Sequence, residues 1–216
     1  MTSGTRNAYA ILLDGDFFAD NRIREMMADR TVIAADGGIR HADALDVTPS
    51  LWVGDFDSSD ADLAKRYAHV KRRQHPPEKA HSDGELAVKI ALEAGASDLF
   101  LVGALGGERT DHALFNLTLG YRLARDTALT VTLTNGHEFA SPLLPGAEIK
   151  PGWSAETLFS IPGLTKLEGL TISNAKWPLD DVEVPLGSTL TLSNVGGPET
   201  VIQLRHGIAY LVARHM

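Results

Sequence analysis

Aspartates recur where apolar segments end in the first half of the chain. Asp36 closes the run TVIAAD and two glycines follow it, while Asp55 and Asp57 close LWVGDFD. Because alternate residues of a strand point to the same side, Asp55 and Asp57 share a face unless the backbone turns between them. Carboxylates this close repel each other, so the pair favours a cation or hydrogen-bond donors beside it.

Two more aspartates stand where helices are expected to begin. Asp83 follows Ser82, and Asp111 ends the run GGERTD. Taken alone, Asp83 or Asp111 is explained equally well as a partner of the helix dipole. For Asp14 and Asp16, the end of a strand is a better explanation than a role as metal ligands. Hard oxygen ligands, in a chain with no cysteine and no regularly spaced histidines, suit Mg²⁺. Magnesium bridges polyphosphate oxygens, so the aspartates together indicate polyphosphate chemistry.

Glycines stand beside these acidic residues. Gly37-Gly38, Gly54 and Gly106-Gly107 would let backbone N–H groups approach a phosphate closely, although two glycines after a strand are usually only a turn. Two familiar phosphate-binding motifs are missing from the sequence. No G-x-x-x-x-G-K-[ST] occurs, and no G-x-G-x-x-G follows the first expected strand, which argues against a dinucleotide site.

The elements that must position these residues alternate in type. Short apolar runs predict strands, and helix-like segments lie between them, of which 82–94 and 111–125 are the clearest. Ser82 and Glu85 form an S-x-x-E capping box at the start of the first helix. This alternation predicts a Rossmann-like α/β domain with a mostly parallel sheet, which binds ligands outside the carboxyl ends of its strands. The expected strands are 10–14, 31–36, 51–55, 69–73, 99–105 and 129–133.

After about residue 136 the helical periodicity disappears. The runs ETLFSIP, KLEGLTI, STLTLSN, ETVIQLR and IAYLVAR are β-like and are separated by Gly, Pro and Asn. They predict a small antiparallel β-sandwich or barrel. We therefore expect two domains, an α/β catalytic domain over residues 1–136 and a β-rich domain over residues 137–216.

The composition is typical of a globular chain that buries a core without disulfides. Of the 216 residues 44% are hydrophobic and 22% are charged, and none is cysteine. The net charge of −8 argues against nucleic acid as a partner, but it is compatible with a nucleotide that brings magnesium. The sequence shows neither a signal peptide nor an apolar run long enough to span a membrane, so we expect a cytoplasmic protein.

In order along the chain, these segments resemble the signatures of thiamine pyrophosphokinases. AADGGIRHADALDVTPSLWVGDFDSS is similar to a D-G-G segment followed by a proline and G-D-x-D-S, and PPEKAHSDGELAV to P-x-x-(K/Q)-D-x-T-D-x-E. GALGGERTDH is similar to G-A-x-G-G-R-x-D-H with one inserted residue. LTISNAKWPL and TLTLSN resemble the late G-L-x-(Y/W)-x-L and S-N motifs. The resemblance covers nearly the whole chain, and the motifs are specific together rather than singly.

The resemblance implies an enzyme that transfers the diphosphate group of ATP to the hydroxyl of thiamine, giving thiamine diphosphate and AMP. It also implies bound Mg²⁺ and a homodimer whose active sites combine residues of both subunits. The implied metal ligands are Asp36, Asp55, Asp57 and Asp83, and the implied catalytic residues are Asp55, Asp57, Asp83, Arg109 and Asp111. The residues implied to bind ATP are Asp36, Gly37, Gly38, Lys79, Ser82, Gly106 and Gly107. Those implied to bind thiamine are Trp177, Ser193 and Asn194.

The sequence departs from the family pattern within the second motif. Ala80 replaces the usual aspartate, which removes one carboxylate and bears on the number or affinity of metal ions. Ser82 replaces the usual threonine but keeps the hydroxyl. Asp83 and Asp111 are both candidates for the group that accepts the proton of the attacking hydroxyl, and the sequence does not choose between them.

Three other functions fit parts of the same pattern. A pyrophosphokinase acting on another alcohol, such as a hydroxymethylpterin, would carry a similar acidic signature. LWVGDFDSS also fits the D-x-D-x-[ST] string of haloacid-dehalogenase-type phosphatases, whose first aspartate is a nucleophile, although no convincing downstream lysine and strand-ending acidic pair accompany it. A non-catalytic nucleotide sensor would not need so complete an acidic set.

Replacing Asp55 or Asp57 by asparagine tests the metal site, because it removes a charge at nearly constant size. Asp55→Asn and Asp57→Asn are each expected to lower turnover on the order of 10²-fold or more, because transition-state charge loses its support. Folding is expected to stay intact, and the magnesium requirement to rise. Steady-state kinetics over a magnesium series measures this, and near-wild-type activity of both variants at ordinary magnesium would contradict the assignment.

Overall fold

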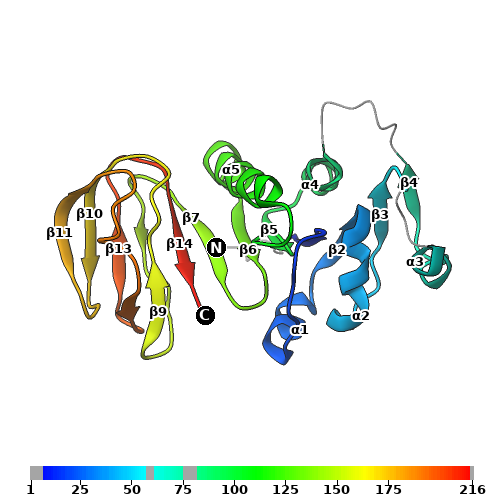
Figure 1. Ribbon diagram of the computed structural model, residues 1–216, viewed down its shortest axis with the longest axis horizontal. Helices are drawn as coiled ribbons and strands as arrows, with labels where there is room; N and C mark the ends of the chain where they lie inside the picture. The colour runs from blue at the N-terminus through cyan, green and yellow to red at the C-terminus, as the bar shows by residue number, and fades with distance from the viewer. Residues whose placement is uncertain (1–6, 57–60, 75–81, 215–216) are drawn as a thin grey trace, which may run out of the picture. The chain divides into compact units, whose positions relative to one another are not determined.

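The computed structural model describes residues 7–56, 61–74 and 82–214. Contacts within the chain divide it into two compact units, residues 1–136 and 137–216 (Figure 1). Within the described ranges, none of the helices is long and apolar enough to cross a membrane.

The first unit is built on a parallel sheet. Its strands run in the order β6-β5-β1-β2-β3-β4, and every neighbouring pair is parallel. Strand β5 is buried along its whole length, as expected for a parallel strand covered on both faces. The predicted α/β class is therefore confirmed. The strands are β1 (Ala8–Leu12), β2 (Thr31–Ala35), β3 (Leu51–Gly54), β4 (Arg72–Gln74), β5 (Asp98–Val102) and β6 (Thr130–Thr134).

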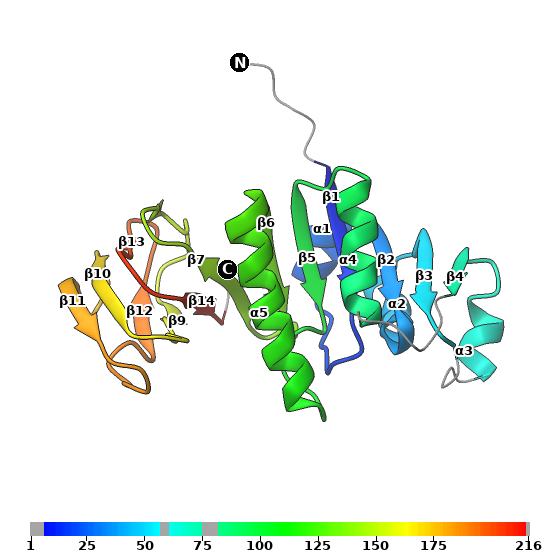
Figure 2. The same ribbon diagram turned by 90° about the horizontal axis from the view of Figure 1, so that it is seen from above.

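Helices cover both faces of this sheet. Figures 1 and 2 show α4 and α5 on one face and α1 and α2 on the other. The helix expected over 82–94 is α4, and the helix expected over 111–125 is α5, each with bounds within two residues of the prediction. The described helices are α1 (Asn21–Met27), the 3-10 helix η1 (Asp36–His41), α2 (Ala42–Leu45), α3 (Ala61–Arg66), α4 (Asp83–Glu93) and α5 (Thr110–Thr127).

The strand order reverses at β1. From β1 the chain continues to β2, β3 and β4 on one side, and then returns to add β5 and β6 on the other. The loops that follow β1 and β5 therefore leave the sheet in different directions, which opens a crevice at the carboxyl ends of these two strands.

A buried ion pair lies at the amino-terminal ends of the strands, opposite the crevice. Arg30, just before β2, contacts Asp98 at the start of β5 with 2.5 Å between Nη1 and Oδ1, and the two side chains are only 13% and 4% exposed. The guanidinium also donates to the backbone oxygens of Tyr9 and Met26 and lies over the ring of Phe100. Arg30 thus connects β1, β5 and the end of α1.

The second unit is an antiparallel sandwich, as expected from the sequence. One sheet has the order β12-β9-β14-β7 and the other β11-β10-β13-β8. Apolar side chains of both sheets form one core, in which the rings of Trp153 and Phe159 lie 4.7 Å apart. The strands are β7 (Phe139–Leu143), β8 (Glu148–Ile149), β9 (Thr157–Ser160), β10 (Leu167–Ser173), β11 (Leu179–Val184), β12 (Asn194–Gly196), β13 (Val201–Gln203) and β14 (Ala209–Ala213).

One strand of this unit was predicted wrongly. The run STLTLSN is not a strand: residues 188–193 turn, and β12 begins only at Asn194. Thr191 is buried there and forms two hydrogen bonds with the backbone of Ile161. The Ile161 N–H donates to the Thr191 carbonyl at 2.9 Å, and the Thr191 hydroxyl donates to the Ile161 carbonyl at 2.7 Å. The neighbouring leucines are exposed, so the polar residue rather than the apolar ones faces inward.

Removing Arg30 tests the buried ion pair. Arg30→Met is expected to lower the free energy of unfolding by about 3 kcal/mol, because it leaves the Asp98 carboxylate buried without this partner. Urea unfolding followed by circular dichroism measures the change. Arg125→Met is the matched control, because Arg125 pairs with Asp126 at the surface, and it is expected to leave the unfolding midpoint in place. Equal midpoints for the two variants would contradict the role given to Arg30.

Candidate active site

A cavity of about 570 Å³ occupies the crevice at the carboxyl ends of β1 and β5. Its walls come from the loop between β1 and α1 (residues 13–20, the β1 loop), the end of β2 with η1, the start of α4, and the segment that leads from β5 into α5. The lining residues are 13–16, 35, 36, 40, 82–84, 103, 106–109, 112, 113 and 116. All belong to the first unit, so the strand-end crevice expected from the sequence is a real cavity.

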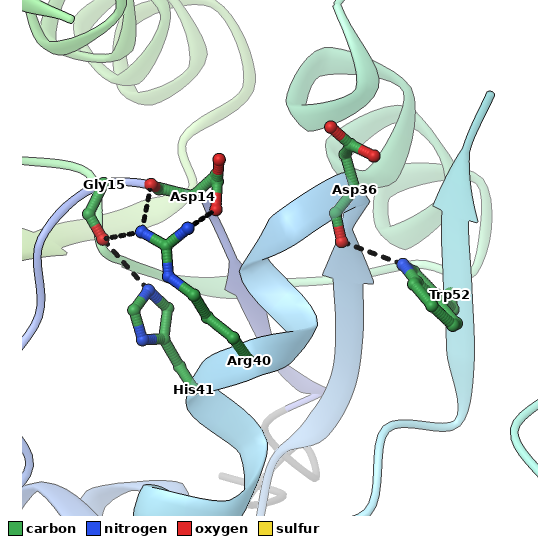
Figure 3. Close-up of polar contacts among 6 residues, drawn as sticks. All are labelled: Asp14, Gly15, Asp36, Arg40, His41 and Trp52. Atoms are coloured by element: carbon green, nitrogen blue, oxygen red, sulfur yellow. Dashed lines mark hydrogen bonds and ion pairs between the residues drawn. The ribbon is translucent and has the colours of Figure 1, made fainter. Parts of the chain in front are cut away.

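Asp36 lines this cavity and is close enough to three other carboxylates to respond to their charge. Burial is the largest cause that raises the pKa of Asp36, and the charges of Asp83, Asp55 and Asp14 raise it further, while the Gly37 N–H opposes them. Asp36 also has a φ of 44°, which is unusual for a residue with a side chain. Its carbonyl accepts a hydrogen bond of 2.9 Å from the Trp52 indole, which supports this backbone turn (Figure 3).

The predicted metal ligands are only partly described. Asp36 and Asp83 line the cavity, and Asp55 lies close enough to act on the charge of Asp36. Asp57 and Lys79 fall outside the described residues. Among the residues that are described, no three His, Asp or Glu side chains are already arranged as a metal site. The four-aspartate ligand set therefore stays a prediction.

The structure gives Gly37 and Gly38 a packing role that the sequence did not show. A Cβ on Gly38 would lie 2.2 Å from the Leu12 carbonyl oxygen, and one on Gly37 would lie 2.4 Å from Asp14 Oδ1. These glycines let η1 pack directly against the end of β1 and the loop after it. The approach of their N–H groups to a phosphate stays a prediction. Gly106 and Gly107 line the cavity itself, and nothing lies within 4 Å of the Cβ position of Gly106.

Arg109 and Asp111 form a two-pronged ion pair at the start of α5. Arg109 Nε donates to Asp111 Oδ1 at 3.0 Å, and Nη2 donates to Oδ2 at 2.7 Å. The hydrogen bonds from Arg109 lower the pKa of Asp111 to about 2. Arg109 lines the cavity, whereas Asp111 is not among the lining residues that the structure describes. Asp111 is thus a carboxylate that resists protonation.

Ser82 lines the cavity and caps α4. Its hydroxyl accepts a hydrogen bond of 3.2 Å from the Glu85 N–H, as the capping box predicts. The Glu85 carboxylate contacts Arg122 of α5 at 2.8 Å. The cap fixes the first turn of α4, and with it Asp83, which is the next residue.

A cluster that the sequence did not single out lies beside Asp36. The guanidinium of Arg40 pairs with the Asp14 carboxylate, and its Nη2 donates to the backbone oxygens of Asp14 at 2.6 Å and Gly15 at 3.4 Å (Figure 3). His41 Nε2 lies 2.9 Å from the same Gly15 oxygen, and burial together with the Arg40 charge lowers the pKa of His41. The sequence signal for this cluster is the basic pair Arg40-His41, which is separated from D-G-G by one residue.

In the second unit, Asn194 holds Trp177 in place. Asn194 is buried, its Oδ1 accepts from the Trp177 N–H at 3.1 Å, and its Nδ2 donates to the Trp177 carbonyl at 2.7 Å. Trp177 as a residue is 53% exposed. The Ser193 N–H donates to Ser160 Oγ at 2.9 Å. Asn194 thus fixes the backbone of Trp177, and the contacts with thiamine expected for Trp177, Ser193 and Asn194 stay predictions.

The model of the family described as thiamin pyrophosphokinase, catalytic domain, matches residues 24–133. The chain belongs to the thiamine pyrophosphokinase family. Its activity is that of a thiamine diphosphokinase, in which the diphosphate group of ATP is transferred to thiamine. The family assignment argues against the three alternatives that the sequence left open: a haloacid-dehalogenase-type phosphatase, a non-catalytic nucleotide sensor, and a pyrophosphokinase acting on a hydroxymethylpterin.

Individual relatives agree with the family model. A curated thiamine pyrophosphokinase of Bacillus subtilis (strain 168) is 30% identical over 167 residues, which are 76% of this chain and 73% of the relative. The fold matches a crystal structure of thiamine pyrophosphokinase from Bacillus subtilis with a TM-score of 0.80 and 24% identity, covering 97% of this chain and 99% of that one. It also matches the Candida albicans enzyme with a TM-score of 0.75 and 16% identity, covering 96% and 89%.

Ser82→Ala separates capping from catalysis. Loss of the cap is expected to lower the free energy of unfolding by about 1 kcal/mol, and loss of the hydroxyl from the cavity wall to lower turnover as well. Ser82→Thr is the control and keeps both properties. Thermal melting and steady-state kinetics measure the two effects. A shifted melting temperature with unchanged kinetics would leave Ser82 only a structural role.

Proposed function

We propose that the cavity of the first unit binds Mg–ATP and that Asp36, Asp55, Asp57 and Asp83 hold the metal. The observation that carries this proposal is the group of carboxylates around Asp36, each of which raises its pKa. Such a group is unfavourable on its own, and a divalent cation would turn the repulsion into attraction. Carboxylate oxygens are also the ligands that magnesium prefers.

The charge of the lining favours the same conclusion. Among the residues that the structure describes, five carboxylates and two guanidinium groups line the cavity: Asp14, Asp16, Asp36, Asp83 and Glu108 against Arg40 and Arg109. A polyphosphate entering so acidic a cavity would be repelled unless a metal accompanied it. When bound, magnesium supplies positive charge to the transferring group. Arg109 would add positive charge from the start of α5 and support the charge that develops in the transition state.

The thiamine hydroxyl attacks the β-phosphorus of ATP, and AMP leaves. Of the two carboxylates that could accept the hydroxyl proton, Asp83 suits the task better. It lines the cavity beside Asp36, whereas the Arg109 ion pair keeps the pKa of Asp111 at about 2 and makes Asp111 a weak base. Most of the acceleration would come from positioning and charge neutralisation.

The second unit would supply the thiamine-binding surface. The exposed Trp177 ring can stack on a cationic heteroaromatic ring, and Asn194 fixes the backbone that presents it. Ser193 would add a hydroxyl next to this surface. We propose further that the enzyme is a homodimer and that the β-rich unit of one subunit completes the active site of its partner. A cytoplasmic location stays a prediction from the sequence.

Mixing two inactive variants tests the shared site. Asp83→Asn and Trp177→Ala are each expected to be nearly inactive alone, the first through the polyphosphate and the second through a raised thiamine requirement. A mixed dimer would have one site that carries neither lesion, so activity is expected to return to a fraction of the wild-type rate. AMP release on adding thiamine measures it, after native mass spectrometry has shown that subunits exchange. Exchange without returning activity would contradict the shared site.

A further inference from the structure

Arg40 holds a fixed position in the proposed polyphosphate cavity. It lies on η1, four residues after Asp36, and lines the same cavity. Its side chain is 42% exposed, so it is neither a buried structural arginine nor a freely moving surface one. The other guanidinium of the lining, Arg109, belongs to α5 on a different wall.

The guanidinium reaches three acceptors on one short loop. It contacts the carboxylate of Asp14, the backbone oxygen of Asp14 and the backbone oxygen of Gly15 (Figure 3). His41 contacts the same Gly15 oxygen from the next position of η1. A planar guanidinium suits such a set because its donors lie on separate nitrogens of a rigid fork, whereas a lysine ammonium is a point charge on a flexible stem.

The last residue of β5 and the residue after it also bond the β1 loop. The Leu13 N–H donates to the Val102 oxygen at 2.8 Å, and the Gly15 N–H donates to the Gly103 oxygen at 3.2 Å. A Cβ on Gly15 would lie 2.3 Å from the Gly103 oxygen, so this approach admits no larger residue. The β1 loop is therefore fixed between η1 and β5, with Arg40 as the polar contact on the η1 side.

Arg40 also reduces the negative charge that the β1 loop presents to the cavity. Asp14 is one of the carboxylates whose charge acts on Asp36. The Arg40 guanidinium offsets that charge at its source, since it contacts the Asp14 carboxylate directly. Without Arg40 the β1 loop would present one more uncompensated carboxylate to an incoming polyphosphate.

We propose that Arg40 is a positioning residue for the nucleotide, acting through Asp14 and Gly15: it fixes the β1 loop as a wall of the cavity and neutralises a carboxylate that would otherwise repel the phosphates. This proposal rests on the proposed function, in which the cavity binds Mg–ATP. It assigns no contact between Arg40 and the reacting atoms.

The direction in which two single substitutions change the affinity for nucleotide tests the proposal. Arg40→Met leaves the Asp14 carboxylate uncompensated, and it is expected to weaken binding of a non-hydrolysable ATP analogue with magnesium about tenfold. Asp14→Asn instead leaves the Arg40 charge in place, and it is expected to bind the analogue as tightly as the wild type or more tightly. Isothermal titration calorimetry measures both dissociation constants. A purely structural pair would give weaker binding in both variants, and that outcome would overturn the proposal.

The double variant and the kinetics extend the test. Arg40→Met combined with Asp14→Asn is expected to regain at least about threefold of the lost affinity, because no free carboxylate remains. The KM for ATP is expected to follow the dissociation constant, while the KM for thiamine stays unchanged. Arg40→Lys keeps the charge but not the fork, so it is expected to fall between the wild type and Arg40→Met. No recovery in the double variant would overturn the proposal.

Two further variants separate this proposal from the one on which it rests. Arg66→Met is the matched control, because Arg66 pairs with Asp43 at 2.5 Å outside the cavity lining, and it is expected to bind the analogue like the wild type. Asp36→Asn reports on the cavity itself. If Asp36→Asn weakens binding and Arg40→Met does not, only the role of Arg40 fails. If neither variant changes binding, the cavity is not the nucleotide site and both proposals fail.

Discussion

Repulsion among carboxylates at the carboxyl ends of the parallel strands is the constraint around which the first unit is organised. Asp14, Asp36, Asp55 and Asp83 come from four different segments, and the sheet brings them to one edge. Part of the repulsion is offset within the chain: Arg40 pairs with Asp14, and the Gly37 N–H donates to Asp36. The rest remains as a raised pKa of Asp36. The unit thus folds around an electrostatic cost that a bound cation would relieve.

Two arginines at opposite ends of the strands differ in what they contribute, one to folding stability and the other to the proposed nucleotide site. Arg30 and Asp98 lie at the amino ends of the strands and are almost completely buried, so breaking their contact leaves a charge in the core. Arg40 and Asp14 lie at the carboxyl ends and are half-exposed. Exposed pairs add little to folding stability. The position of Arg40 is therefore better explained by the cavity than by the stability of the fold.

The sequence predicted the class of both units, because the periodicity of apolar residues follows from which faces are buried. It also placed Asp36, Asp55, Asp57, Asp83 and Asp111 where strands end or helices begin. Of these, Asp36 and Asp83 line the cavity, whereas Asp111 is not among the lining residues that the structure describes. It failed where tertiary contacts override local pattern. Thr191 faces inward because Ile161 offers it two hydrogen bonds, and no periodicity reveals that. Likewise, nothing in the sequence shows that Arg40 would reach back across the sheet to Asp14, 26 positions earlier.

The chain also contains its own optical reporter. It has three tryptophans, of which Trp52 and Trp153 are 1% and 2% exposed while Trp177 is 53% exposed. The two buried indoles emit from an apolar surrounding and respond when their unit unfolds. The emission of Trp177 comes from a ring in contact with water, so it responds to whatever covers that ring. Occupancy of the Trp177 surface and loss of the fold therefore shift the fluorescence spectrum in opposite directions, the first to shorter and the second to longer wavelength.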